Sequence, residues 1–78
     1  MALFSEIKQM IKQLFGFEDA EVTEDINLQI DLGVDSIGMT SLVTAINAKY
    51  GLELLFDDVV ELENIGELIS LVESKIPA

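Results

Sequence analysis

Cysteine and histidine are both absent from the sequence, and only four of its 78 residues are basic. Without cysteine the chain can form no disulfide, offers no thiolate nucleophile and cannot build a thiolate zinc site. Without histidine it can form neither a Ser-His nor a Cys-His pair, and it lacks the usual acid or base near neutral pH. These absences count against an enzyme with an ordinary nucleophilic or zinc-dependent mechanism.

Long apolar runs are absent as well. No run approaches the roughly 20 residues that a membrane-spanning helix needs. The N-terminus lacks the basic segment and the apolar core of a signal peptide. A chain of 78 residues corresponds to one domain. We therefore expect a single domain over residues 1–78, present in the cytoplasm as a monomer and without a membrane span.

The charge is strongly one-sided. Fifteen Asp and Glu residues against four Lys and Arg give a net charge of −11. Such a field repels nucleic acid and anionic membranes and attracts basic protein surfaces. Half of the residues are hydrophobic, which is far from the composition of a disordered chain. The expected partners of this folded domain are therefore proteins and not nucleic acid.

The spacing of apolar residues indicates two long helices. The first runs from about Ala2 to Phe15 and ends before Gly16, and the second runs from about Ser36 to Tyr50 and ends at Gly51. The apolar stripe of the first consists of Leu3, Ile7, Met10, Ile11 and Leu14, and the core-facing residues of the second are Met39, Leu42, Val43, Ile46 and Tyr50.

Two further helices are predicted in the second half of the chain. Phe56 to Leu62 has the length of a short helix, with Val59, Val60 or Leu62 turned inward. Asn64 and Glu67 have the spacing of a capping box, which opens a last helix to about Lys75 with Pro77 as its stop. Leu52 to Leu54 alternates like a strand but has no partner strand, so we predict a connector there.

Residues 17–35 form a long connection between the first two helices. Loops of this length are uncommon in compact domains and tend to be functional. Seven apolar residues are spread along it, and we expect several of them to pack onto the helices; they are Phe17, Val22, Ile26, Leu28, Ile30, Leu32 and Val34. A helical turn is expected near Asp25–Leu28. The predicted fold is all-α, a small four-helix bundle with a long first loop and a short third helix.

The stretch Asp31–Met39 leads from this loop into the second helix. Asp35 is a good N-cap residue, because its carboxylate can accept a backbone N–H of the first turn. Ser36 then lies at the first helical position. A helix N-terminus has free N–H donors and a partial positive charge, so it favours a phosphate. A serine hydroxyl held at this place suits a phosphate ester.

Leu32-Gly33-Val34-Asp35-Ser36-Ile37, followed by an amphipathic helix, resembles the phosphopantetheine attachment site of acyl carrier proteins. The resemblance covers the chain from about Leu3 to Ile76. It implies that Ser36 carries a covalent 4'-phosphopantetheine, with Asp35 beside it in the binding site. It also implies that a phosphopantetheinyl transferase attaches the arm from coenzyme A. The thiol of the arm would hold acyl or aminoacyl groups as thioesters for acyl-activating, acyl-transferring or condensing enzymes, and the carrier would have no enzymatic activity itself.

The second helix departs from the usual carrier pattern. Fatty-acid carriers typically have acidic residues on its outer face, whereas the helix from Ser36 to Tyr50 contains no acid and one base, Lys49. The outer face is predicted to hold Ile37, Thr40, Ser41, Thr44, Asn47 and Ala48, and the expected partner contacts are Asp31, Ile37, Thr40, Ser41 and Thr44. Gly38 replaces a residue that is usually polar or acidic, at an expected cost of up to ~1 kcal/mol against alanine.

This departure favours a specialised polyketide-like, peptide-like or aminoacyl pathway over housekeeping fatty-acid synthesis, although fatty-acid synthesis stays open. The sequence does not name the cargo, and it leaves open whether an acyl chain enters the bundle. The alternative function is an unmodified helical interaction domain with the same fold.

Calcium binding is a competing reading of the acidic residues. Asp31 to Asp35 loosely resembles the start of an EF-hand loop, but Ser36 stands where the central glycine is required, and Leu42 where a bidentate glutamate is needed. A cluster of acids before it could bind divalent ions weakly; it consists of Glu18, Asp19, Glu21, Glu24 and Asp25. A solvated acidic surface is the preferred interpretation, so we expect no defined metal site. No carboxylate pair stands out as a catalytic acid and base.

Overall fold

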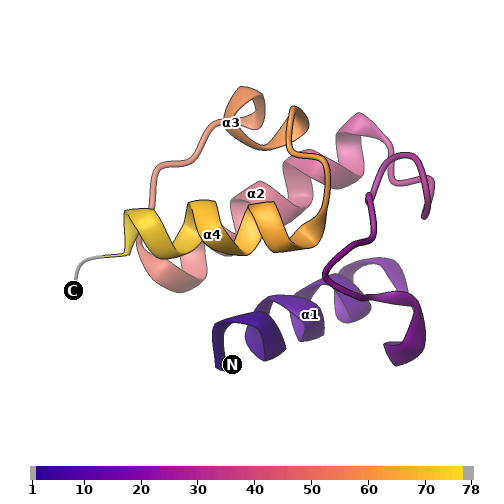
Figure 1. Ribbon diagram of the computed structural model, residues 1–78. Helices are drawn as coiled ribbons and strands as arrows, with labels where there is room; N and C mark the ends of the chain where they lie inside the picture. Colours follow the sequence, from indigo (N-terminus) through magenta and orange to yellow (C-terminus); the bar gives the residue numbers. More distant parts are fainter. Residues whose placement is uncertain (1, 77–78) are drawn as a thin grey trace.

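The computed structural model describes residues 2–76, and all of its regular structure is helical (Figure 1). The elements in chain order are α1 (Ala2–Phe15), the 3₁₀ helix η1 (Asp19–Glu21), α2 (Ser36–Tyr50), α3 (Phe56–Val60) and α4 (Ile65–Lys75). Between residues 2 and 76 there is no strand, including at Leu52–Leu54. The predicted all-α bundle with a long first loop and a short third helix is confirmed.

The bounds of α1 and α2 agree with the prediction because both helices end at glycines. Gly16 has a φ of +75° and donates its N–H to the carbonyl of Lys12 at 2.8 Å. Gly51 has a φ of +67° and donates to the carbonyl of Asn47. Backbones with positive φ strain other residues, so glycine is the ordinary residue at such a helix end. Local sequence signals were therefore sufficient to define these two helices.

The third helix is shorter than predicted. α3 ends at Val60 and not at Leu62, because the Leu62 N–H turns back to the carbonyl of Val59 at 3.1 Å. This i to i−3 bond tightens the last turn and closes the helix. At least one of Val59, Val60 and Leu62 was expected to face inward, and Val59 does so, since it is fully buried while the other two are half-buried.

The predicted capping box at the start of α4 is only half formed. Asn64 Oδ1 accepts the N–H of Glu67 at 2.9 Å, as expected. Glu67 Oε1, however, accepts the N–H of Glu63 at 2.7 Å rather than that of Asn64. The reciprocal bond is thus shifted by one residue towards the N-terminus. Pro77, the predicted stop, lies outside the described residues.

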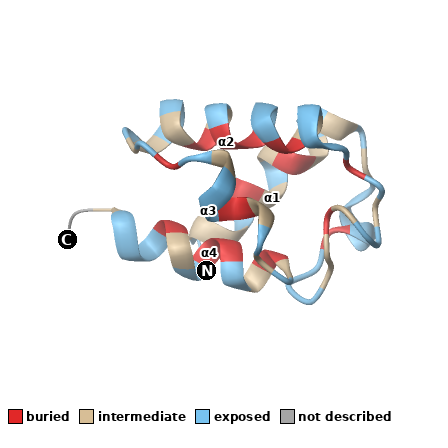
Figure 2. Ribbon diagram, turned by 90° about the horizontal axis from the view of Figure 1, so that it is seen from above, coloured by how far each residue is buried: buried red, intermediate tan, exposed pale blue. Residues whose placement is uncertain are grey.

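The core lies between the four helices and also includes residues of the long loop. Figure 2 shows that the buried parts of the helices face one another, while the outer sides are exposed. The buried residues are Ile7, Ile11, Val22, Leu28, Val34, Met39, Leu42, Val43, Ile46, Leu54, Val59, Ile65, Leu68, Ile69 and Val72. Leu14, predicted in the core stripe of the first helix, is instead 43% exposed, and of the seven apolar loop residues Ile30 alone is exposed, at 82%. Phe15, next to Leu14, packs against the core.

Loop 1, residues 16–35, is tied to both α1 and α4. Asp19 lies 3.0 Å from Lys12 Nζ and 3.2 Å from Lys8 Nζ, and these two ammonium groups hold the pKa of Asp19 below its usual value. At the other side, the N–H of Ile65 donates to Ile26 O at 3.0 Å, and the N–H of Gly66 donates to Glu24 O at 2.8 Å. These backbone bonds hold the loop against the start of α4.

The helical turn expected near Asp25–Leu28 forms slightly later in the chain, and a 3₁₀ helix that was not predicted precedes it. The 3₁₀ helix lies at Asp19–Glu21, where the carboxylate of Glu21 accepts the N–H of Glu18 at 2.9 Å. A second turn spans residues 27–31, because the N–H of Asp31 donates to Asn27 O at 2.8 Å. Side-chain to backbone bonds thus decide where this loop turns.

The sequence analysis placed Asn47 on the outer face of α2, and this prediction was wrong. The Asn47 side chain reaches the connector to α3, where Nδ2 donates to Leu54 O at 2.9 Å and Oδ1 accepts the N–H of Leu54, also at 2.9 Å. Leu54 is 5% exposed, so its backbone groups need protein partners. Asn47 supplies both of them, in the way that a neighbouring strand would.

Replacing Asn47 with alanine should therefore destabilise the fold. The substitution leaves the backbone N–H and carbonyl of the buried Leu54 without their side-chain partners. Each buried polar group without a partner costs about 1–3 kcal/mol of stability. We expect a loss of about 2 kcal/mol in urea denaturation followed by circular dichroism. Ala48→Ser, on the exposed side of the same turn, is the matched control and should change stability by less than about 0.5 kcal/mol. Equal stability of Asn47→Ala and the wild type would contradict this role.

Candidate functional site

The start of α2 is set by a hydrogen bond from the backbone of Gly38 to the side chain of Asp35. Asp35 Oδ1 accepts the N–H of Gly38 at 2.8 Å, while Asp35 O accepts the N–H of Met39 at 2.9 Å. The backbone of Asp35 is extended, with φ −83° and ψ −180°. These are the features of an N-cap residue, so the predicted roles of Asp35 as cap and of Ser36 as first helical residue are confirmed.

Ser36 is exposed, and its hydroxyl and backbone N–H are free of intramolecular hydrogen bonds among residues 2–76. Among residues 2–76, no hydrogen bond involves the Ser36 hydroxyl, and the N–H groups of Ser36 and Ile37 have no intramolecular acceptor. A phosphate ester on this oxygen would have helix N-terminal donors beside it. The carboxylate of Asp35 is near, but one of its oxygens is already engaged by Gly38. The residues therefore fit a phosphate group attached at Ser36.

Beside Ser36 lies an open recess of about 360 Å³ between α2 and α3, which we name the Ser36 trough. It is lined by Ser36, Ile37, Thr40, Ser41 and Phe56. The Thr40 hydroxyl donates to Ser36 O at 2.9 Å, so Thr40 faces the trough with its methyl group and an oxygen acceptor. No charged side chain lines the trough. Its surface is therefore apolar and hydroxylic.

Phe56 was missed as a site residue by the sequence analysis. It is the first residue of α3 and half-buried, and its neighbour Leu55 is 66% exposed. The available signal was the run Leu54-Leu55-Phe56, which has more apolar side chains than one turn of connector can bury. Only the fold shows that Phe56 reaches the trough.

The predicted partner-contact residues are brought only partly together. Ile37, Thr40 and Ser41 share the trough, and Ile37 is 77% exposed. Thr44 lies one turn further along the same exposed side of α2 and donates its hydroxyl to Thr40 O at 2.9 Å. Asp31 lies in loop 1, where its carboxylate accepts the N–H of Asn27 at 2.9 Å. It is exposed, so its charge still acts at a distance.

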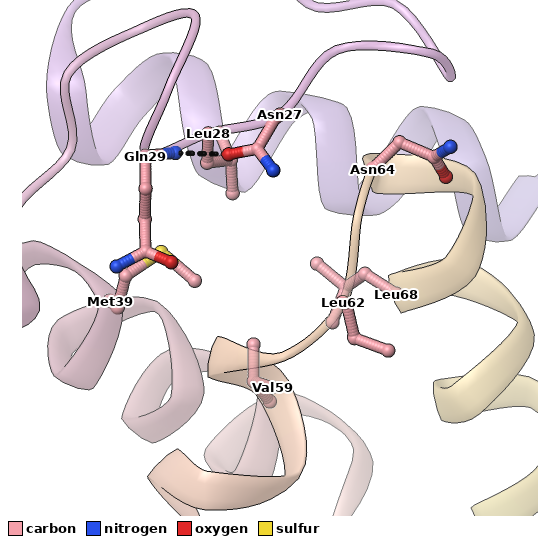
Figure 3. A pocket seen from close by; sticks show the side chains of 8 residues that line it. All are labelled: Asn27, Leu28, Gln29, Met39, Val59, Leu62, Asn64 and Leu68. Carbon is pink, nitrogen blue, oxygen red and sulfur yellow. Dashed lines mark hydrogen bonds between the residues drawn. The ribbon is translucent and has the colours of Figure 1, made fainter.

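A small cavity lies inside the bundle, between loop 1, α2, α3 and α4 (Figure 3). Its volume is about 20 Å³, and it is lined by Asn27, Leu28, Gln29, Met39, Val59, Leu62, Asn64 and Leu68. A space of this size is enough for about one water molecule. In this conformation the interior has no room for a chain of methylene groups.

Neither a metal site nor a membrane helix is found in the described part of the chain. Over residues 2–76, no three His, Cys, Asp or Glu side chains are grouped so that they could hold a metal ion. Asp19, in the acidic cluster, is paired with Lys8 and Lys12. Across the same range, none of the helices has the length and apolar character needed to cross a bilayer.

Comparison with known proteins gives the class. The family model described as "Phosphopantetheine attachment site" matches residues 5–72. The chain is 30% identical to the acyl carrier protein of Thermotoga maritima, over 95% of this chain and 91% of that protein. It is 33% identical to that of Lactobacillus johnsonii, over 92% and 90%, and 31% identical to that of Solidesulfovibrio magneticus, over 96% and 96%.

The chain belongs to the acyl carrier protein family. It is a carrier that bears a covalently attached 4'-phosphopantetheine, and it is not an enzyme. Acyl carrier proteins work with phosphopantetheinyl transferases and with enzymes that handle acyl groups. When bound, the arm supplies the thiol that this cysteine-free chain lacks.

Packing explains why glycine occupies position 38, a reason that the sequence did not reveal. A Cβ atom built on Gly38 would lie 2.7 Å from Val34 Cγ1, 3.1 Å from Phe15 Cε1 and 3.3 Å from Asp35 Oδ1. Val34 is buried at 8% exposure, so it has little freedom to move away. The close approach of loop 1 and α1 thus outweighs the low helix propensity of glycine. The expected gain from alanine at this position was based on propensity alone.

Gly38→Ala should therefore destabilise the protein, although alanine favours helices. Overpacking costs about 1–3 kcal/mol, against a propensity gain of up to ~1 kcal/mol, so we expect a net loss of about 1–2 kcal/mol in urea denaturation. A double-mutant cycle provides the control. In a Val34→Ala background the tightest of the three contacts is removed while those with Phe15 and Asp35 remain, so Gly38→Ala should cost clearly less than in the wild type. Stabilisation in the wild-type background would refute the packing argument.

Proposed function

We propose that Ser36 is the residue that carries the phosphopantetheine arm. The observation that carries this proposal is the exposed, unbonded hydroxyl at the first position of α2, directly after the Asp35 cap. The family match over residues 5–72 includes this position. Asp35 acts as a positioning residue, because its bond to Gly38 decides where α2 begins.

The chemistry that this proposal requires of the chain is limited. The Ser36 oxygen forms the new bond to phosphorus when the transferase acts, the bond to the departing part of coenzyme A breaks, and the hydroxyl proton leaves to the transferase. The chain has no histidine and contributes no general base. Its part is to present the hydroxyl outward and keep the helix start rigid. The family match favours this carrier function over an unmodified interaction domain.

We further propose that partner enzymes contact the outer side of α2 through Ile37, Thr40, Ser41 and Thr44. Any enzyme that reaches Ser36 has to approach this surface, which is exposed in Figure 2. Direct contact is apolar and hydroxyl-mediated, since α2 has no carboxylate. Asp31 and Asp35, at the loop end of α2, contribute longer-range attraction to basic partner surfaces.

The uncharged outer side of α2 supports the proposal that this carrier acts in a specialised polyketide-like, peptide-like or aminoacyl pathway. Fatty-acid enzymes whose basic surfaces complement an acidic α2 would form no ion pairs with this helix. The loss of these ion pairs lowers their association rates with the carrier. The 20 Å³ cavity supports a cargo that is short or that stays outside the core, unless α3 or loop 1 moves. The cytoplasmic location and the monomeric state stay predictions.

The attachment site can be tested by coexpression with a phosphopantetheinyl transferase and intact-mass measurement. The wild type should gain the mass of one arm, and peptide mapping should place it on the Ser36 peptide. Ser36→Ala should gain nothing and keep its helical circular dichroism, because the Ser36 hydroxyl forms no hydrogen bond. Ser70→Ala, at an exposed serine on α4 away from this surface, is the matched control and should be modified normally. A mass gain in Ser36→Ala would disprove the assignment.

Partner choice can be tested by giving α2 an acidic outer side. Thr40→Glu, Ser41→Glu and Thr44→Glu together should raise the rate of the holo form with a fatty-acid acyl transferase by about 3- to 10-fold at low salt, with the gain shrinking as salt rises. The control adds the same charge on α1 and α4 through Gln9→Glu, Ser70→Glu and Ser74→Glu. If the unsubstituted carrier already works as well as a fatty-acid carrier, the specialised-pathway proposal fails.

A further inference from the structure

The ring of Phe15, at the end of α1, packs against the first turn of α2. A Cβ atom at Gly38 would lie 3.1 Å from Phe15 Cε1 and 3.3 Å from Asp35 Oδ1. It would also lie 2.7 Å from Val34 Cγ1. The ring edge, the carboxylate oxygen and the methyl group thus surround one point beside the Gly38 Cα. Asp35 Oδ1 is also the atom that accepts the Gly38 N–H at 2.8 Å, so the ring borders the hydrogen bond that begins the helix.

Phe15 and Val34 are both held in place by their surroundings. Phe15 is the last residue of α1, which ends at Gly16 with a φ of +75°. Its ring packs against the core, and its centroid lies 6.0 Å from that of the Phe17 ring. Val34 is 8% exposed, and its N–H donates to Leu28 O at 3.0 Å. Two side chains with fixed positions therefore limit the movement of the first turn of α2.

Phe15 lies away from the surface that partner enzymes are proposed to contact. Phe15 and Asp35 line an open recess of about 370 Å³ beside α1, and its lining residues do not overlap with those of the Ser36 trough. An apolar ring beside the cap bond keeps water from competing for it, and the edge of an aromatic ring carries partial positive charge, which suits a nearby carboxylate. Phe15 is therefore placed to act on Ser36 through the Asp35 cap.

We propose that Phe15 is a positioning residue for the attachment of the phosphopantetheine arm. This inference rests on the proposed attachment at Ser36. The Phe15 ring keeps the bond between Asp35 and Gly38 closed, and the closed cap keeps Ser36 at the first helical position with its hydroxyl outward. When the cap opens, the hydroxyl loses its fixed direction. The end of α1 thus sets the fraction of carrier molecules that can accept the arm.

The test follows arm attachment by intact mass, at several carrier concentrations, with a phosphopantetheinyl transferase and coenzyme A. Phe15→Ala removes the ring and should lower kcat/KM about 5- to 20-fold, because only the capped fraction of the carrier reacts. Phe15→Leu keeps most of the apolar volume and should recover most of the rate. Leu14→Ala is the matched control, since Leu14 is the neighbouring residue, lines the same recess and is 43% exposed. It should react like the wild type.

Two further measurements show whether Phe15 acts through the cap. In amide hydrogen exchange of the free carrier, Phe15→Ala should speed the exchange of the Gly38 N–H several-fold. The amides of Leu42 and Val72, inside α2 and α4, should keep their protection. Asp35→Ala breaks the cap itself, so Phe15→Ala added to it should lower the rate by less than about twofold more.

The outcomes separate this inference from the proposed function. Absence of a mass gain in the wild type overturns the attachment at Ser36, and this inference with it. A normal rate in Phe15→Ala overturns the inference alone. A lower rate with unchanged exchange at Gly38 also overturns it, because the transferase would then contact the ring directly. If Phe15→Ala loses protection at Leu42 and Val72 as well, the milder Phe15→Val decides by the same measurements.

Discussion

The hydrogen bond between Asp35 Oδ1 and the N–H of Gly38 decides how this carrier presents its serine. With Asp35 as N-cap, α2 cannot begin earlier, and Ser36 has to occupy the first helical position with its hydroxyl outside. The missing Cβ of Gly38 allows Val34 and Phe15 to approach this same turn. One helix start therefore joins loop 1, α1 and α2, and the proposed attachment site is part of the packing of the domain rather than an addition to its surface.

The negative charge of the domain lies outside α2, the helix that begins at Ser36. Acidic residues lie in α1, loop 1, α3, α4 and the connectors, whereas α2 has none. Two of the four basic residues, Lys8 and Lys12, are paired with Asp19 and hold loop 1 on α1. The remaining negative field can attract basic partners from a distance. The surface beside Ser36, where we propose that partners bind, is apolar and hydroxylic, which suits selection by shape more than by ion pairs.

The position of α3 explains both why the interior of the bundle is filled and why the Ser36 trough is open. This five-residue helix buries Val59 against the core and places Phe56 beside α2. Loop 1 closes the opposite side, because the backbones of Ile26 and Glu24 are bonded to the start of α4. The bundle is consequently filled inside, and its free apolar space lies outside, next to the attachment residue.

The sequence by itself determined the class of the fold, the bounds of α1 and α2, and the position of Ser36. These features depend on signals within a few residues, namely the Asp35 cap, the terminal glycines and the helical spacing of apolar side chains. Such signals act through bonds and conformations that each segment forms on its own. They failed where more than one local arrangement was possible, as with the turns of loop 1, the end of α3 and the second hydrogen bond of the capping box at α4.

The tertiary structure decided whatever depends on residues far apart in the chain. Asn47 reads as an outer-face residue, yet Leu54 meets it once the chain has reversed, and the unpaired backbone of a buried leucine draws the amide inward. Gly38 reads as a weak helix former, yet Val34 and Phe15 leave no room for a Cβ. Phe56 was predicted only as the start of the third helix, yet the fold places it beside Ser36. In each case, packing between distant segments outweighs the local preference, and no local pattern carries that information.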